Sequence, residues 1–148
     1  MLVPERVKAL IVDDNAYARS AMAAILRKLG IRQISETGTA PEALLTLMSR
    51  SFDVLLMDWY MPDMSGAALA RILRDPRFGP HGRLPVVLMT AYPSREVISA
   101  AKDLGISEIL TKPVTLDQVS LVLQRLLGGW DIPADEPLTA PSEDTFLI

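Results

Sequence analysis

Four short runs of apolar residues along the chain each end in polar or charged side chains. The run at 9–12 leads into Asp13 and Asp14, and the run at 54–57 leads into Asp58. The run at 86–89 leads into Thr90, and the run at 109–110 leads into Thr111 and Lys112. An unbroken apolar run of this length is typical of a strand buried on both faces of a parallel sheet. Open α/β folds bind their ligands at the carboxyl edge of such strands. We therefore expect these polar side chains to meet in one site.

Segments with helical spacing of apolar residues separate the strands. They lie at residues 16–29, 41–50, 67–73, 95–104 and 115–127, and a weaker strand at 31–37 is polar enough to lie at or near the sheet edge. Asn15 or Asp14 can cap the first helix, and Gly30 stands where that helix ends. The connector at 75–84 contains two prolines and two glycines, which break regular structure. Strand and helix alternate five times, which predicts an α/β protein with a parallel sheet and helices on both faces.

Composition narrows the class of protein. The 148 residues, with an apolar share of 49% and no cysteine, fit one domain without a disulfide framework or a thiolate metal site. A formal net charge of −3 argues against nucleic-acid binding, which usually requires a basic face. The first residues do not resemble a signal peptide, and no run approaches the ~20 apolar residues of a membrane span. We expect a cytoplasmic protein that binds neither DNA nor a membrane.

Residues 129–148 differ in character from the rest of the chain. Pro133, Pro137 and Pro141 stand among five acidic residues there. This composition is typical of a tail or linker rather than of a packed core. The sequence therefore divides into a domain at residues 1–128 and a Pro-rich acidic tail or linker at residues 129–148.

Asp13, Asp14 and Asp58 are expected at one edge of the sheet. Carboxylates packed together repel one another unless a cation lies between them, and Mg²⁺ binds one or two carboxylates, a carbonyl and water around an incoming phosphate. Lys112 supplies a positive charge and Thr90 a hydroxyl for phosphoryl oxygens. These groups fit phosphoryl transfer, which depends on positioning and charge neutralisation. Asp58 is the candidate nucleophile because its strand should lie at the centre of the sheet.

With these residues in order, the chain resembles the receiver domains of two-component response regulators over about residues 6–128. The resemblance rests on an ordered set of motifs after four strands: Val12-Asp13-Asp14-Asn15, Met57-Asp58-Trp59-Tyr60-Met61-Pro62, Gly66, Thr90-Ala91 and Lys112-Pro113. It implies a flavodoxin-like, doubly wound, five-stranded parallel sheet with strand order 2-1-3-4-5. It also implies a phosphoprotein that catalyses only its own phosphorylation and dephosphorylation.

The resemblance implies a role for each site residue. Asp58 would accept the phosphoryl group from a histidine kinase or a histidine phosphotransfer protein. Asp13, Asp14, Asp58 and the backbone carbonyl of Tyr60 would bind Mg²⁺. Thr90 and Lys112 would bind the phosphoryl oxygens, and the Lys112–Pro113 peptide would be cis.

Two positions depart from the family pattern. Ile109 stands where Tyr or Phe usually precedes the lysine by three residues, and Val114 stands where Phe often follows Lys-Pro. Isoleucine cannot supply the inward swing of an aromatic ring, so the switch is expected to use other elements. Tyr60 and Tyr92 each lie two residues beyond a key group, where a bulky ring can obstruct the water that attacks the acyl phosphate. We therefore expect a phosphorylated state that lasts longer than in receivers with small or acidic residues at both positions.

The resemblance indicates a single-domain regulator that signals by protein–protein contact to an unknown downstream protein. The kinase would contact the first helix around Tyr17, Arg19, Ser20, Met22 and Ala23 and the loop after Lys112, and the helices that begin at residues 95 and 115 would form the output surface with the last strand. Three alternatives stay open. The first is a receiver fragment of a longer hybrid kinase or regulator, the second is a phosphorylation-independent adaptor, and the third is a haloacid-dehalogenase-like phosphatase. Adjacent Asp13 and Asp14 disfavour the phosphatase, which needs two aspartates spaced by one residue.

Overall fold

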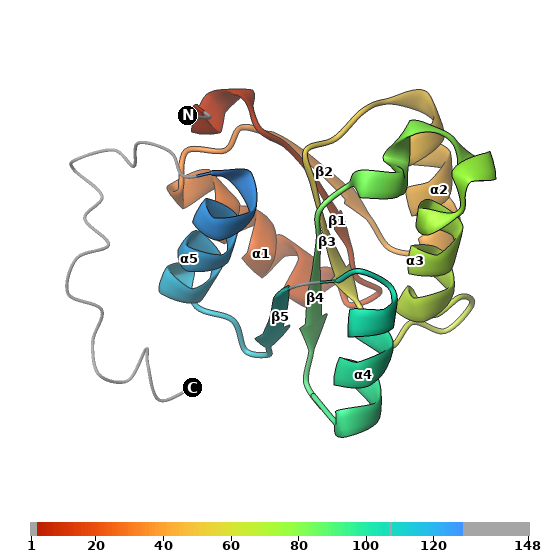
Figure 1. The fold of residues 1–148 in the computed structure, drawn as a ribbon. Coiled ribbons are helices and arrows are strands. Elements are labelled where there is room, and N and C mark those ends of the chain that lie inside the picture. The colour runs from red at the N-terminus through yellow and green to blue at the C-terminus, as the bar shows by residue number, and fades with distance from the viewer. Residues whose placement is uncertain (1–2, 107, 129–148) are drawn as a thin grey trace.

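A five-stranded parallel sheet lies between two layers of helices in the computed structural model, which describes residues 3–106 and 108–128 (Figure 1). The strand order is β2-β1-β3-β4-β5, so the predicted flavodoxin-like topology is confirmed. The strands are β1 (Lys8–Val12), β2 (Gln33–Thr37), β3 (Val54–Asp58), β4 (Val86–Thr90) and β5 (Glu108–Thr111).

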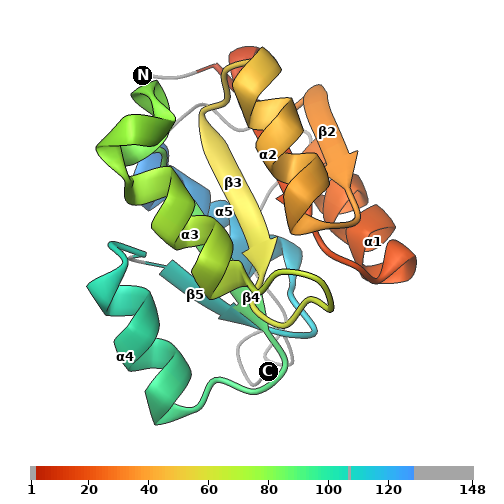
Figure 2. The same ribbon diagram turned by 90° about the vertical axis from the view of Figure 1, so that its right-hand side faces the viewer.

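Five helices cover the sheet, with α1 and α5 on one face and α2, α3 and α4 on the other (Figures 1 and 2). They are α1 (Ala16–Lys28), α2 (Ala40–Ser49), α3 (Gly66–Arg74), α4 (Arg95–Asp103) and α5 (Leu116–Leu127). Each begins after a polar residue whose side chain accepts a backbone N–H from the first turn, which satisfies a donor that the helix itself cannot. These caps are Asn15, Thr39, Ser65, Ser94 and Thr115.

The buried strands explain the unbroken apolar runs. Every residue of β3 and β4 is buried. Alternate side chains enter the two cores, so Leu55 and Met57 pack toward α2 and α3 while Leu56 packs toward α1 and α5. A strand with a core on each side cannot show the polar alternation of a surface strand.

The connector between α3 and β4 is more regular than its Pro and Gly content predicts. It forms two short 3-10 helices, η2 (Pro76–Phe78) and η3 (Pro80–Arg83), and a third, η1 (Pro4–Arg6), precedes β1. The expectation of no regular element there was wrong because proline, with its fixed φ, favours the first turn of such helices. The β2 strand also begins two residues later than predicted, since Ile31 donates its N–H to Leu26 at the end of α1.

The register brings the carboxyl ends of the strands together. Val12 pairs with Met57, Asp58 with Met89, and Thr90 with Thr111. The residues that end β1, β3, β4 and β5 therefore share one edge of the sheet. No helix in the described ranges is both long and apolar enough to cross a bilayer. The predicted tail at residues 129–148 lies outside the described residues.

Candidate functional site

The fold places the predicted polar residues in one small site. Asp13 directly follows β1, Asp58 and Thr90 end β3 and β4, and Lys112 directly follows β5. Asp13, Asp58 and Thr90 are buried, whereas Asp14 is exposed. Two carboxylates are thus held in a protein environment in which an unpaired charge is costly.

Lys112 is the cation that pairs with both of these carboxylates. Its Nζ lies 2.8 Å from Asp13 Oδ2 and 3.5 Å from Asp58 Oδ2. Burial lowers the pKa of Lys112, but the hydrogen bond to Asp13 and the charges of both aspartates outweigh burial and leave the pKa above its ordinary value. The amine therefore stays protonated and is held between the two carboxylates.

Asp58 lies farther from Lys112 than Asp13 does, at 3.5 Å compared with 2.8 Å. Burial raises the pKa of its carboxyl group, and the nearby charges of Asp13 and Asp14 raise it further, while Lys112 opposes them. The net pKa lies above the ordinary value for aspartate. A second cation beside Asp58 would lower that pKa and stabilise the carboxylate form that acts as a nucleophile.

The three aspartates have the geometry of a site for a hard cation. One carboxylate oxygen from each of Asp13, Asp14 and Asp58 lies within 4.8 Å of the others. Oxygen donors of this kind, open to water on the side of exposed Asp14, fit Mg²⁺, which retains several water ligands. Tyr60 lies in the loop after β3, and the role of its backbone carbonyl stays a prediction.

Backbone contacts hold Asp13 in place. Its Oδ1 accepts the N–H of Asn15 at 2.9 Å, and its carbonyl accepts Arg19 Nη1 at 2.7 Å. Arg19 also lies 3.7 Å from Glu36 at the end of β2. We predicted Arg19 as part of a partner surface, and the structure adds a positioning role that spacing along the helix does not reveal.

Gly66 allows α3 to start directly beneath Asp58. A Cβ atom at this position would lie 2.6 Å from the carbonyl oxygen of Asp58 and 3.0 Å from the Cα of Trp59. The N–H of Gly66 donates to the carbonyl of Trp59 at 2.9 Å, which closes the loop after β3. The glycine is therefore required by close backbone approach rather than by an unusual φ.

Thr90 lies at the junction between β4 and the loop that follows it. Its Oγ1 accepts the N–H of Tyr92 at 3.1 Å, and its carbonyl accepts the N–H of Lys112 at 2.8 Å. The hydroxyl is buried beside the site. The Lys112–Pro113 peptide is cis, as predicted.

A largely apolar groove of about 430 Å³ adjoins the site between α1 and the loop after β5. Tyr17 on α1, which is 86% exposed, lies at this groove together with Pro113 and Val114. Met22 and Ala23, which we also placed on the partner surface, are each only 1% exposed. Both face the sheet from the inner side of α1, and of the two only Met22 lines the groove.

The residues that depart from the family pattern pack as aliphatic side chains. Ile109 is half-buried against the core under α2, α3 and α4, and Val114 packs against the core under α1 and α5. Tyr60 and Tyr92 are exposed, at 55% and 74%, in the loops after β3 and β4. The kinetic role of these two rings stays a prediction.

A doubly wound parallel α/β domain with a lysine-paired cluster of aspartates at the carboxyl edge of its sheet defines the class of this protein. The family described as "Response regulator receiver domain" matches residues 9–124. The chain belongs to this family of two-component signalling domains.

Relatives agree with this assignment. The chain is 34% identical over 126 residues to the chemotaxis protein CheY of Pseudomonas aeruginosa, a match that covers 82% of this chain and all of the relative. It is similar in structure to CheY4 of Vibrio cholerae, with a TM-score of 0.74 at 27% identity over 81% of this chain and 98% of that one. The receiver domain of a sensor histidine kinase from P. aeruginosa, described with a magnesium ion in its active-site cleft, also has a TM-score of 0.74, at 25% identity over 83% and 98% of the two chains.

Proposed function

We propose that this chain is a single-domain response regulator whose Asp58 accepts a phosphoryl group from a histidine kinase or a histidine phosphotransfer protein. The observation that carries the proposal is the convergence of Asp13, Asp58 and Lys112, with Lys112 Nζ at 2.8 Å and 3.5 Å from the two carboxylates. The family membership and the CheY relatives support the same function.

In this reaction an Asp58 carboxylate oxygen attacks the donor's phosphorus in line with the leaving group. The bond from phosphorus to the donor breaks, the donor retains the electron pair, and an acyl phosphate forms on Asp58. Lys112 neutralises charge on the phosphoryl oxygens, and the Thr90 hydroxyl donates a hydrogen bond to one of them. Asp13, Asp14, Asp58 and the Tyr60 carbonyl would hold Mg²⁺, which would supply further neutralisation of the transferring group.

The phosphoryl group changes the charge balance around Lys112. It adds about −1.5 to −2 charges near neutral pH. Lys112, now shared between Asp13 and Asp58, would shift toward the new oxygens and loosen its contact with Asp13. The loops after β4 and β5 carry Thr90 and Lys112, so the change would reach α4, β5 and α5, which we propose as the output surface. Ile109 packs against the core and has no aromatic ring that could swing inward. The signal is therefore expected to pass through the loop after β4 and through α4.

The groove between α1 and the loop after β5 is the proposed docking surface for the phosphodonor protein. It borders Asp13 and Lys112 and offers apolar side chains, among them Tyr17 and Ile25. A donor histidine placed there would be next to Asp13 and Lys112, and Lys112 Nζ lies 3.5 Å from Asp58 Oδ2. The largely apolar lining fits an amphipathic helix laid across the groove.

One alternative has its own support. A receiver domain from a sensor histidine kinase is among the similar structures, which favours a receiver within a longer signalling chain as the second candidate. Phosphorylation of Asp58 is common to both. The adaptor alternative does not require the Lys112-paired carboxylates, and the family membership disfavours a phosphatase.

Intact mass after incubation with Mg²⁺ and acetyl phosphate tests the proposal. We expect one added phosphoryl group on the wild type, and none on Asp58→Ala or in the presence of EDTA. Thermal unfolding confirms that the variant is folded. A folded wild type that gains no mass from acetyl phosphate or from a histidine kinase would favour the adaptor. Turnover of a small phosphomonoester would favour the phosphatase.

A further inference from the structure

Charge is unevenly divided between the domain and the segment that follows it. All 15 Lys and Arg residues, but only 13 of the 18 acidic residues, lie in residues 1–128, so this part carries a net charge of +2. The remaining five acidic residues lie in residues 129–148, which contain no basic residue and therefore carry −5. The overall charge of −3 conceals these opposite signs.

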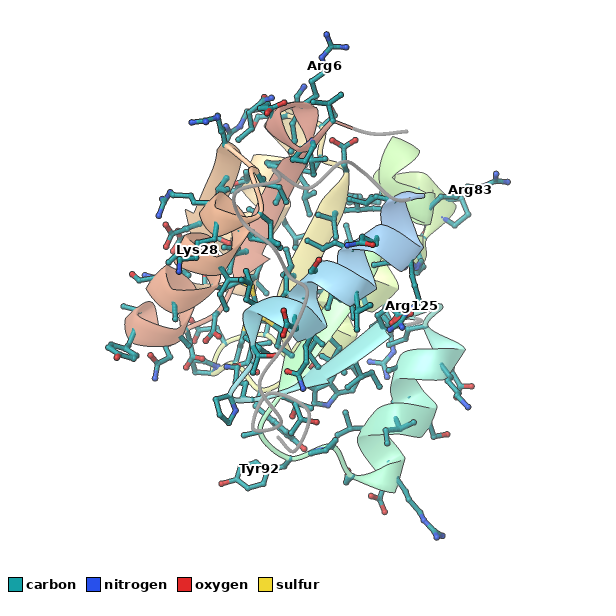
Figure 3. All side chains as sticks on the ribbon, turned by 90° about the vertical axis from the view of Figure 1, so that its left-hand side faces the viewer. Arg6, Lys28, Arg83, Tyr92 and Arg125 are labelled. Atoms are coloured by element: carbon teal, nitrogen blue, oxygen red, sulfur yellow. The ribbon has the colours of Figure 1, made fainter. Side chains whose placement is uncertain are left out.

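Most basic residues of the domain lie at the amino edge of the sheet, where the helices end and the strands begin. Five acidic residues, Glu5, Asp53, Asp75, Asp103 and Glu108, also lie at this edge, so the excess of positive charge there is local rather than complete. Figure 3 shows Arg6 and Arg83 toward the upper end of the molecule, Lys28 at its side and Tyr92, from the loop after β4, at the lower end. The basic edge is thus remote from the phosphorylation site.

A pocket at this basic edge concentrates three cations. It has a volume of about 550 Å³ and is lined by Lys8, Arg32 and Arg50 together with Gln33, Ile34, Ser35, Ser51 and Phe52. Arg50 is held in place, since its Nη2 donates to Ser35 Oγ at 3.0 Å and its guanidinium lies 5.5 Å from the Phe52 ring centre. Among the described residues, no carboxylate forms an ion pair with any of the three cations. The Asp53 carboxylate lies close to this edge, but its Oδ2 accepts the backbone N–H of Lys8 at 2.8 Å.

The acidic segment starts close to this edge. The α5 helix ends at Leu127, at the end of the sheet where β1 and β2 begin (Figure 1). The pocket lies on the α2 side of the sheet, whereas α5 lies on the other side. The path from the end of α5 to the pocket is therefore about two helix diameters long, roughly 20 Å. Residues 135 and 136 lie seven and eight residues beyond Gly128, which gives a reach of about 25 Å, and Glu143 and Asp144 reach roughly 50 Å.

From these observations we infer that the acidic segment at residues 129–148 binds the basic pocket formed by Lys8, Arg32 and Arg50 in the same chain. Carboxylates of the segment supply the anions that these cations lack. Tethering gives the segment a local concentration in the millimolar range, so a weak intrinsic affinity suffices. The contact leaves Asp58 and the groove beside α1 open, and it does not depend on the proposed phosphorylation. Its expected consequence is competition with other acidic partners for this edge of the domain.

A spin label on the acidic segment tests this inference in the full chain. The sequence contains no cysteine, so Ser142→Cys provides a single attachment site next to Glu143. We expect the label to broaden the amide signals of Gln33, Ser35 and Ser51 selectively. Raising the salt from about 20 mM to about 500 mM shortens the Debye length from roughly 20 Å to roughly 4 Å and should abolish the broadening.

Paired charge variants distinguish binding at the pocket from nonspecific electrostatic attraction between the segment and the domain. Lys8→Gln combined with Arg32→Gln should remove most of the broadening. Arg95→Gln, an exposed cation at the start of α4 on the opposite edge, should leave it unchanged. A control mixes two chains: one carries the spin label but no ¹⁵N, and the other carries ¹⁵N but no spin label. Little broadening of the ¹⁵N-labelled chain is expected if the contact is intramolecular.

Three results would overturn the inference. Broadening centred on α4, β5 and α5 would place the segment on the output surface, and strong broadening between chains would make the contact intermolecular. No localised broadening at low salt, with inorganic pyrophosphate shifting the same pocket amides, would instead assign the pocket to a phosphorylated ligand.

Discussion

Replacement of Gly66 by alanine tests the close approach of α3 to the phosphoacceptor strand. The new Cβ would lie 2.6 Å from the Asp58 carbonyl oxygen, 3.0 Å from Trp59 Cα and 3.2 Å from Met57 Cε. Carbon and oxygen atoms in good contact are about 3.5 Å apart, so backbone must move by nearly 1 Å. The Met57 side chain can adjust, but the carbonyl and Cα cannot move without shifting the end of β3.

The expected cost follows from comparing two opposing effects. Overpacking typically costs about 1–3 kcal/mol, and contact with backbone places this variant at the upper end of that range. Alanine is favoured over glycine inside a helix by up to about 1 kcal/mol, and Gly66 begins α3, where this benefit is smallest. We therefore expect a net loss of about 2 kcal/mol in the free energy of unfolding.

Urea unfolding measures this loss, with Gly82→Ala as a matched control. A Cβ at Gly82 would find its nearest atom, the Leu73 carbonyl oxygen, at 3.9 Å. The control should stay within about 0.5 kcal/mol of the wild type. Because the strain falls on Asp58, the Gly66→Ala variant should also accept phosphoryl groups more slowly. Equal stability of the two variants would refute the steric account of Gly66.

Four further predictions follow from the described contacts. Lys112→Ala should cost about 3 kcal/mol without divalent cations, because it leaves a buried aspartate unpaired, and Mg²⁺ should restore part of this loss in thermal unfolding. In EDTA, wild-type stability should fall as pH rises from the ordinary aspartate pKa of about 4 through the raised pKa of Asp58, so urea unfolding should show Asp58→Asn gaining on the wild type as pH rises above about 4. Arg74 donates to the carbonyls of Leu84 at 2.9 Å and Leu104 at 3.0 Å, so Arg74→Ala should cost about 2–4 kcal/mol, with Arg74→Lys recovering only part. Tyr60→Glu and Tyr92→Ala should each speed loss of the phosphoryl group, measured by intact mass over time.

Each of these predictions has a contrary outcome. A metal-free Lys112→Ala variant as stable as the wild type would show that the aspartates are neutralised in another way. A constant stability difference between Asp58→Asn and the wild type across the pH range would remove the basis for the raised pKa. If Arg74→Lys restored the full stability of the wild type, the several hydrogen bonds of the guanidinium would not be needed at this position. Unchanged or slower dephosphorylation in both tyrosine variants would reduce these rings to surface residues without a kinetic role.

The apolar runs were sufficient to predict the strands and the meeting of Asp13, Asp58 and Lys112. Their ends share an edge because parallel strands in this topology run in register, so a pattern local to each strand determines a distant contact. The surface of α1 was harder to predict. Met22 belongs to the apolar stripe and is buried, yet it also lines the groove with Tyr17.

Arg74 and the 3-10 helices show where the sequence was insufficient. The guanidinium of Arg74 joins the connector to the end of α4 through carbonyls at residues 82, 84 and 104. These acceptors are backbone atoms, so no residue type marks them in the sequence. Arg19 is a similar case, because its bond to the Asp13 carbonyl depends on the path of the chain rather than on a motif.

The site of phosphorylation tests the central claim most directly. After incubation with Mg²⁺ and acetyl phosphate, borohydride reduction converts an aspartyl phosphate to homoserine, and mass spectrometry of the peptides locates it. We predict homoserine at position 58 and at no other aspartate, with none formed when Mg²⁺ is omitted. Homoserine at Asp13, Asp14 or Asp63, or modification that is independent of Mg²⁺, would contradict the assignment of Asp58 as the phosphoacceptor.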